Sequence, residues 1–355
     1  MMKKLSTMVL NFALLANISG LLLITLSNHY IMMFVGLELM TFSFITIMSP
    51  TSPRQVESSV KYFIIQASAS IILLLSLIFP STQISMIFHA TLIMSLLVKL
   101  AAAPFHSWFP EVTQGMKWKP AALILTWQKL GALIILSRTL MTESKTIMTA
   151  TAVTSAVIGA IGGLNQVQTR KIMAYSSISH MGWTLLLFTI SQPIAMTYFV
   201  VYSIITVSIM MTMEYHNSNH LSKMHMDSFL SPWTVAATLS LILSLGGLPP
   251  LGGFLNKVMA FKEMINNNLS VITLIMILSS LTSLFFYLRI SYSTTLTSSS
   301  QHTLSMLTMR TKKMTTSSTH KTPPFTMIIA SSHIIPILGL IIAPTMVVSL
   351  MNMTS

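Results

Sequence analysis

The first feature of this sequence is a lysine in the middle of an apolar segment. Lys99 lies in an apolar run that begins near Ile84, and Pro104 follows it closely. An ammonium group in hydrocarbon costs about 2.5–3.5 kcal/mol on insertion scales, so it needs a functional or structural reason. Pro104 lacks an N–H and bends a helix, which frees a backbone carbonyl near the lysine. If the helix continued, Lys99 and His106 would share one face. Together these groups predict a proton path.

Two more charged residues lie in the middle of apolar segments. Glu38 is near the centre of the segment 29–48, and Lys129 is near the centre of 120–140, too far from either end for comfortable snorkelling. A protonated, hydrogen-bonded carboxyl is one reading of Glu38. We favour a partner for a buried lysine, because ionisable groups at membrane depth are functional by default.

A second broken segment carries another lysine. Residues 246–253 hold four glycines and two prolines, which cannot form a regular helix, and Lys257 follows them. Unwound backbone at membrane depth is tolerated only where protein or a water cavity satisfies it. In the segment around Pro104 the lysine precedes the proline, whereas here it follows. Two such segments, one in each half, indicate inverted repeats around an ion path at the membrane midplane.

These residues predict a mechanism. Burial disfavours the charged form of an amine, and a nearby carboxylate favours it. A change in the distance between Glu38 and Lys99 would therefore load or unload a proton. Arginine cannot do this, because it does not deprotonate. We expect Lys129 and water to carry the proton laterally, and Lys257 to pass it to the far side.

Other basic side chains have plainer alternatives. Lys61 lies close to a helix start, so we favour a structural role in which it reaches the membrane interface. For His106, a role in the relay and a role outside it are both open. For His180 we favour a hydrogen-bonded packing residue over a role in the relay.

Three histidines in a polar loop have spacing that permits one chelating pair, but no cysteine or carboxylate pair supports them, and we read the loop as solvated: His216, His220 and His225. We expect no metal site, phosphate loop, dinucleotide fingerprint or nucleophilic triad.

Composition sets the class of protein. The 355 residues are 53% hydrophobic and 8% charged, far below the approximately 25% charged residues of soluble domains. The net charge of +13 comes from scattered single residues, so it does not indicate nucleic-acid binding. The absence of cysteine excludes disulfides and iron–sulfur clusters held by this chain. Thirty methionines fit a genetic code with an extra methionine codon, as in animal mitochondria.

The elements that position these residues are membrane helices. We predict an all-α polytopic membrane protein with a single membrane domain over residues 1–355. Its repeat-like halves are about 29–140 and 146–290, followed by a loop at 291–325 and a C-terminal helix at 326–350. A second long loop is expected at 214–231. The eleven predicted spans are 5–26, 29–48, 59–79, 84–109 (broken at Pro104), 120–140, 146–166, 172–191, 193–213, 232–263 (broken at Pro249 and Pro250), 270–290 and 326–350.

Charge asymmetry supports this count. Alternating the loops between two sides leaves only Arg138, Lys145 and Lys262 on the side opposite the N-terminus. The positive-inside rule therefore predicts an N-terminus inside and a C-terminus outside. The first apolar run is read as a retained helix rather than a cleaved signal peptide. The N-terminal side receives Lys3, Lys4, Arg54, Lys117, Lys119, Arg170, Lys171, Lys223, Arg289, Arg310, Lys312, Lys313 and Lys321.

Several runs resemble the antiporter-like membrane subunits of respiratory complex I. They are residues 36–38, 59–63, 99–115, 125–129, 171–183 and 247–257, among which the most specific reads Ala103-Pro104-Phe105-His106-Ser107-Trp108-Phe109-Pro110-Glu111-Val112-Thr113-Gln114-Gly115. One departure is Ala101-Ala102, where the family pattern leads us to expect a glycine-containing pair.

The resemblance implies proton translocation in the mitochondrial inner membrane, with the N-terminus in the matrix and the C-terminus in the intermembrane space. It implies that Glu38 and Lys99 form the modulating pair, that Lys129 is the connecting site of the proton path, and that Lys257 is the site on its exit side. Neighbouring antiporter-like subunits and lipids are the implied partners. NADH, FMN, Fe–S clusters and ubiquinone would belong to other parts of the complex, with no cofactor bound by this chain.

Two alternatives stay open. One is a stand-alone cation/proton antiporter of the same architecture. The other is a membrane scaffold whose buried charges are inert ion pairs. Against the scaffold, Glu38 alone cannot neutralise the lysines within the spans, namely Lys61, Lys99, Lys129 and Lys257.

Overall fold

The computed structural model describes residues 2–48, 51–78, 85–139, 145–215, 232–249 and 251–308. Every regular element within these ranges is a helix. The helices are α1 (Met2–Leu26), α2 (Tyr30–Met48), α3 (Pro53–Ile78), α4 (Ser85–Leu100), α5 (Trp108–Gly115), α6 (Trp118–Leu125), α7 (Trp127–Thr139), α8 (Lys145–Leu164), α9 (Thr169–Ile190), α10 (Gln192–Tyr215), α11 (Pro232–Gly246), α12 (Gly252–Asn266) and α13 (Ser270–Thr308).

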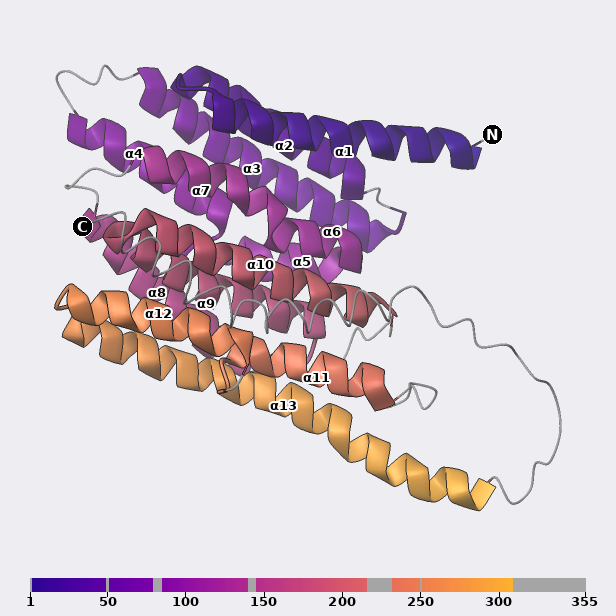
Figure 1. Ribbon diagram of the computed structural model, residues 1–355. Helices are drawn as coiled ribbons and strands as arrows, with labels where there is room; N and C mark the ends of the chain where they lie inside the picture. The colour runs from indigo at the N-terminus through magenta and orange to yellow at the C-terminus, as the bar shows by residue number, and fades with distance from the viewer. Residues whose placement is uncertain are drawn as a thin grey trace.

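The helices lie side by side in one bundle with their axes roughly aligned (Figure 1). The pair α1 and α2 forms one edge, and α11, α12 and α13 form the opposite edge. Seven helical segments of the described chain are long and apolar enough to cross a membrane. Two shorter apolar segments, Phe88–Leu100 and Ala236–Gly246, end at the breaks in the bundle. The predicted all-α polytopic class is confirmed.

The predicted spans correspond to helices over the described residues. The first ten spans each coincide with one helix, or with two helices separated by a break. The breaks at Pro104 and before α12 were predicted. The break at Thr126, which divides the span 120–140 into α6 and α7, was not. The eleventh span, 326–350, lies outside the described residues.

The loop boundaries differ in one place. Helix α13 continues to Thr308, so the prediction of a loop from residue 291 is wrong over the first part of that loop. The Ser- and Thr-rich segment that begins at Ser291 contains no Pro or Gly that would end the helix there. The rest of 291–325 lies outside the described residues, as do 216–231 with their histidines.

Helix α9 occupies the centre of the bundle. Its residues from Ser176 to Phe188 are all buried, including Ser177 and His180. Small residues allow α8 to approach closely. A side chain at Gly182 would run into the backbone of Ala152 and Ala156 on α8. Close approach through small residues is how membrane helices gain packing energy without a hydrophobic driving force. Helix α9 can thus keep polar side chains inside an apolar bundle.

Outer helices present apolar side chains to the surroundings. Phe12 and Leu15 on α1, and Leu274 and Phe285 on α13, are strongly exposed. A soluble protein rarely exposes so much apolar surface, whereas lipid accepts it. The charged residues considered below lie deeper.

Candidate functional site

Glu38 and Lys99 form an ion pair inside the bundle. Glu38 Oε1 on α2 is 3.3 Å from Lys99 Nζ on α4. The Lys99 side chain is 3% exposed, whereas that of Glu38 is 21% exposed. The structure therefore brings the predicted pair together, with the lysine deep and the carboxylate nearer the periphery.

Helix α4 ends immediately after Lys99. The Ala101 N–H donates to Val98 O at 3.1 Å, and the Ala102 N–H donates to Leu97 O at 3.0 Å. These two bonds are the Schellman C-cap, whose C′ residue adopts the left-handed conformation usually taken by glycine. Ala101 has φ 56°. The departure from a glycine-containing pair thus falls on a position that favours glycine.

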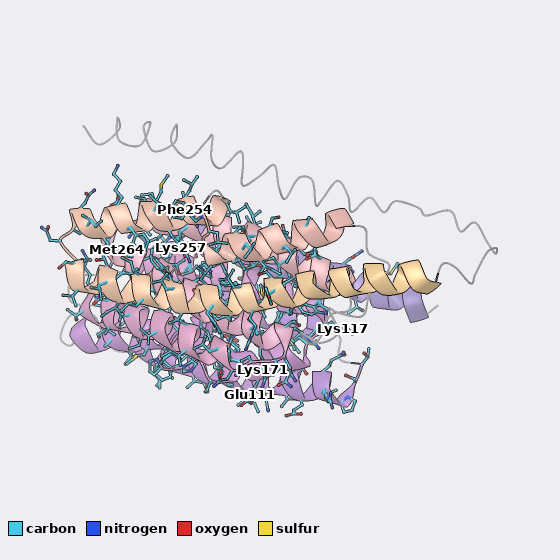
Figure 2. The ribbon with its side chains drawn as sticks, turned by 90° about the horizontal axis from the view of Figure 1, so that it is seen from below. Glu111, Lys117, Lys171, Phe254, Lys257 and Met264 are labelled. Atoms are coloured by element: carbon cyan, nitrogen blue, oxygen red, sulfur yellow. The ribbon has the colours of Figure 1, made fainter. Side chains whose placement is uncertain are left out.

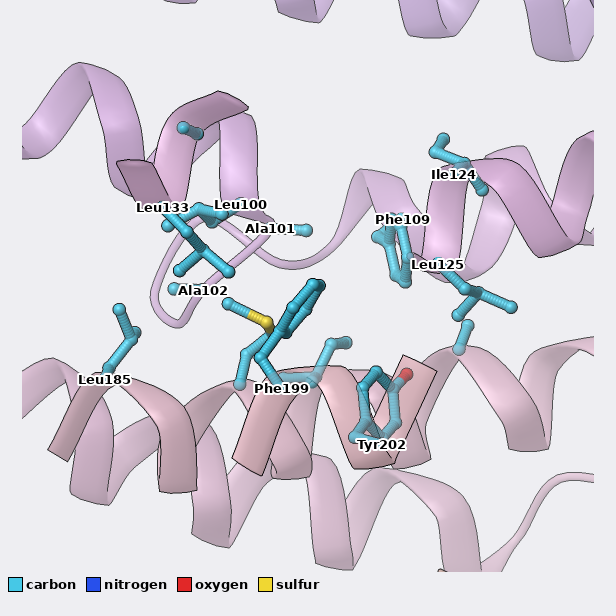
Figure 3. Packing of buried hydrophobic residues seen from close by; sticks show 14 of the residues in the cluster. Leu100, Ala101, Ala102, Phe109, Ile124, Leu125, Leu133, Leu185, Phe199 and Tyr202 are labelled. Atoms are coloured by element: carbon cyan, nitrogen blue, oxygen red, sulfur yellow. The ribbon is translucent and has the colours of Figure 1, made fainter. Parts of the chain in front are cut away.

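The chain beyond this cap crosses the bundle without helical structure. The Ala103 N–H donates to Ser155 Oγ on α8 at 2.9 Å, so the non-helical backbone finds a side-chain acceptor. Figure 3 shows Ala101 and Ala102 facing Phe199 of α10, with Phe109 on the far side of the loop.

The geometry corrects the argument for His106. Because α4 ends at Leu100, the helix does not continue to His106, and the shared helix face considered for Lys99 and His106 does not form. His106 is half-buried, with Nδ1 3.2 Å from Pro104 O in its own loop.

Lys129 is buried near the start of α7. Its side chain is almost fully enclosed, with the residue 2% exposed. Nζ donates to Ser177 Oγ at 2.5 Å and lies 4.7 Å from the ring centroid of Phe109. A hydroxyl and an aromatic face thus stabilise the ammonium. No carboxylate of the described chain lies within ion-pair distance of it.

The unpredicted break positions Lys129. Thr126 departs from helical geometry, with φ −125° and ψ −75°, and separates α6 from α7. Its Oγ1 donates to Ala122 O at 2.8 Å, which satisfies a carbonyl at the end of α6. No proline or glycine lies at this site, so the local sequence did not predict the break.

Lys257 lies against the end of α11. It is 6% exposed, and Nζ donates to Gly246 O at 2.9 Å. Helix α11 ends in the same cap as α4. Gly247 has φ 77°, its N–H donates to Ser244 O, and the Leu248 N–H donates to Leu243 O. Figure 2 shows Lys257 on α12, the helix that also carries Phe254 and Met264. Pro250 lies outside the described residues.

A cavity of about 20 Å³ separates Lys99 from Lys129. This volume accommodates roughly one water molecule. Its wall contains both lysines and several neutral polar side chains. The lining residues are Leu37, Met40, Thr41, Tyr62, Gln66, Lys99, Trp108, Phe109, Ile124, Gln128, Lys129 and Ala132.

Helices α9 and α10 contribute further buried polar side chains near Lys129. Ser177 contacts Lys129, and one turn later His180 accepts or donates through Nδ1 to Tyr198 Oη at 2.8 Å. The rings of His180 and Tyr202 are 4.9 Å apart. The two tyrosines were missed because a tyrosine in an apolar helix usually indicates core packing.

Lys61 does not belong to the buried row. It pairs with Glu57 Oε1 at 2.8 Å and with Glu111 Oε2 at 3.1 Å, and its side chain is 44% exposed. This ion triad ties α3 to α5, which agrees with the structural reading. Among the residues described, no group of three His, Asp or Glu side chains could hold a metal ion.

Residues 27–283 match the family model described as NADH:quinone oxidoreductase/Mrp antiporter, TM. The NADH-ubiquinone oxidoreductase chain 2 of Didelphis virginiana is 37% identical over 341 residues, which are 92% of this chain and 95% of that protein. The mouse (Mus musculus) protein of the same name is 39% identical over 282 residues, covering 76% of this chain and 81% of its own length.

Solved structures share the fold. A chain of respiratory complex I from Thermus thermophilus with bound aureothin superposes with a TM-score of 0.79 at 23% identity, covering 94% of this chain and 78% of that chain. A chain of the Mrp complex from Dietzia sp. superposes with a TM-score of 0.70 at 20% identity, covering 78% and 59%. At these identities the likeness concerns the fold alone.

Proposed function

We propose that the buried charges of this chain, which belongs to the NADH:quinone oxidoreductase/Mrp antiporter membrane family, carry protons across the membrane. Within that family, the chain groups with NADH-ubiquinone oxidoreductase chain 2. The chain is a membrane subunit of respiratory complex I in the mitochondrial inner membrane. Proton translocation there is coupled to electron transfer from NADH to ubiquinone.

The observation that carries the residue assignment is the Glu38–Lys99 ion pair at one end of a row of buried lysines. The pair can switch because the carboxylate stabilises the ammonium, and separation of the two groups favours proton release. Glu38 and Lys99 are therefore the modulating pair, Lys129 the connecting site, and Lys257 the site on the exit side.

Neutral polar groups fill the gaps between these charges. The cavity lined by Lys99 and Lys129 is large enough for one water, and Ser177 and the buried His180 on α9 would continue the relay from Lys129 towards Lys257. Hydroxyl and imidazole groups can both donate and accept, as a proton relay requires. His106 is a weaker candidate, since it lies in the loop beyond the α4 cap.

The proposal extends to orientation, repeats and partners. Charge asymmetry supports a matrix N-terminus and a C-terminus in the intermembrane space. The shared caps of α4 and α11 support two repeat-like halves, about 29–140 and 146–290. The neighbours would be other antiporter-like subunits and lipids. NADH, FMN, Fe–S clusters and ubiquinone would bind elsewhere in the complex, and this chain has no cysteine to ligate a cluster.

The test is Lys99→Ala in the assembled complex. We expect NADH-driven proton pumping in proteoliposomes to fall at least tenfold, because the ionisable amine is removed. Lys61→Ala is the matched control, since Lys61 also pairs with glutamates but is exposed, and it should pump normally. Normal pumping by an assembled Lys99→Ala complex would overturn the assignment. Sodium–proton exchange by the purified chain alone would favour the stand-alone antiporter.

A further inference from the structure

The indole N–H of Trp108 has no acceptor among the described residues. Trp108 opens α5, is 8% exposed, and its Nε1 is fully buried. Buried Trp N–H groups usually find a hydrogen-bond partner, and one without a protein partner points to an internal water. The proposed relay does not use this donor.

Trp108 lines the cavity shared by Lys99 and Lys129. A cavity of about 20 Å³ holds one water, provided that the water finds two to four polar partners. The wall offers Gln66 and Gln128 in addition to the lysines and the indole. The site is therefore both large enough and polar enough for a water.

We propose that Trp108 holds a water between Lys99 and Lys129 and thereby acts as a positioning residue for lateral proton transfer, an inference that rests on the proposed function. The indole N–H is only a donor, so it occupies one lone pair of the water oxygen. The other lone pair accepts from the ammonium of one lysine, while a water hydrogen points to the amine of the other.

Proton transfer through this water is balanced. The Lys99 ammonium gives a proton to the water oxygen as the water gives a different proton to the Lys129 amine. One N–H bond breaks, one forms, and the water stays neutral. Trp108 takes part only by fixing the orientation of the oxygen.

The neighbouring elements fix Trp108 and limit the space. The ring centroids of Trp108 and Phe109 are 5.4 Å apart in an edge arrangement, and Tyr62 lies 6.3 Å from Trp108. Phe109 covers the Lys129 ammonium on one side of the cavity. These contacts keep the cavity close to the size of one water.

The test is Trp108→Phe, which removes the N–H and keeps an aromatic ring. We expect about fivefold slower proton pumping and a larger solvent isotope effect in D₂O, because one oriented hydrogen bond is lost. A cryo-EM map of the parent should show a water within about 3 Å of Nε1. That water should be displaced in the variant. Trp108→His, which restores a ring N–H, should recover part of the rate.

Trp118→Phe is the matched control. Its Nε1 is also buried without an acceptor among the described residues, but Trp118 stacks under Arg170 and does not line the cavity. This variant should pump at the parental rate. Parental pumping by Trp108→Phe, or a parent map without the water, would overturn the inference.

Proton pumping by a Lys129→Ala variant, measured in parallel, distinguishes failure of the positioning role of Trp108 from failure of the proposed function. If Lys129→Ala abolishes pumping while Trp108→Phe does not slow it, only the positioning role fails. If Lys129→Ala pumps normally, the proposed function fails whatever the map shows at Trp108. If Trp108→Phe does not assemble, the parent map and Trp108→His decide the matter.

Discussion

The buried lysines differ in what stabilises them. Lys99 has a carboxylate, Lys129 has a hydroxyl and an aromatic face, and Lys257 has a backbone carbonyl. Neutral partners hold an amine in place without committing it to the charged form. Such partners suit the proposed uptake and release of protons, whereas a fully ion-paired row would keep its protons.

Ser177→Ala tests the partner of Lys129. The change removes the only side-chain hydrogen bond that the structure gives to that ammonium. We expect roughly tenfold slower pumping in an assembled complex, because hydrogen bonds to charged groups are strong. Ser179→Ala is the control, since its hydroxyl bonds to Ser176 O on the same helix. Equal pumping rates in the two variants would exclude the role of Ser177.

That the charged residues lie inside the bundle could be predicted from the sequence, but which neutral groups they contact could not. A charge such as Glu38 or Lys129 stands out in an apolar segment because burial is costly there. Ser177, Tyr202 and Trp108 are ordinary residues of membrane helices. Their roles depend on which helices pack together, and local sequence does not encode that.

At the scale of elements, one cap is used twice with different residues. The caps after α4 and α11 have the same hydrogen bonds, but the left-handed position is Ala101 in one and Gly247 in the other. An alanine there is strained by roughly 1 kcal/mol. Gly247 has an additional constraint, since a Cβ would lie 2.8 Å from Cδ of Lys257.

Gly247→Ala should therefore both destabilise the complex and slow proton pumping. We expect destabilisation of about 1–3 kcal/mol from backbone strain and from displacement of Lys257, together with slower pumping. Thermal dissociation of the detergent-purified complex measures the first effect, and proteoliposomes measure the second. Gly246→Ala is the control. Its Cβ would lie 2.8 Å from the end of the flexible Leu284 side chain and 3.5 Å from Cδ2 of Tyr287, an ordinary van der Waals distance, so pumping should be retained.

The sequence predicted helix breaks only where it contains special backbone residues. Pro104 and the glycines before α12 restrict or free the backbone, so their breaks were predictable. Thr126 has no such property, and its break depends on the packing of α6 and α7 in the bundle. The end of α13 was misplaced because a change from apolar to polar residues was taken as a helix end, although the helix continues to Thr308.

At the scale of the whole molecule, arginines tie distant helices together at their ends. Arg138 of α7 donates to Thr25 O at 2.6 Å and to Ser27 O at 2.5 Å at the end of α1. Arg289 of α13 donates to Leu164 O and Gln166 O at 2.6 Å each, at the end of α8. A guanidinium suits this task because its fork reaches several carbonyls and stays charged. It also complements the negative end of a helix dipole.

Arg138→Ala tests whether this contact stabilises the assembly. We expect a loss of about 1–3 kcal/mol, because carbonyls at the end of α1 lose a charged donor. The complex should dissociate at a lower temperature in detergent, while pumping per assembled complex stays unchanged. Arg54→Ala removes an exposed arginine and should leave the dissociation temperature unaltered. An unchanged temperature for Arg138→Ala would contradict this role.

The carbonyl that accepts from Lys257 gives the two ends of the lysine row different counter-charges. At Lys99 the counter-charge is Glu38, an acid that can be neutralised. At Lys257 it is the carboxyl end of α11, a permanent dipole of about half a charge that no change of pH removes. The counter-charge at the Lys99 end of the row can be neutralised, whereas the counter-charge at the Lys257 end cannot. The proposed proton path would therefore have two unlike ends, only one of which has a counter-charge that protonation can remove.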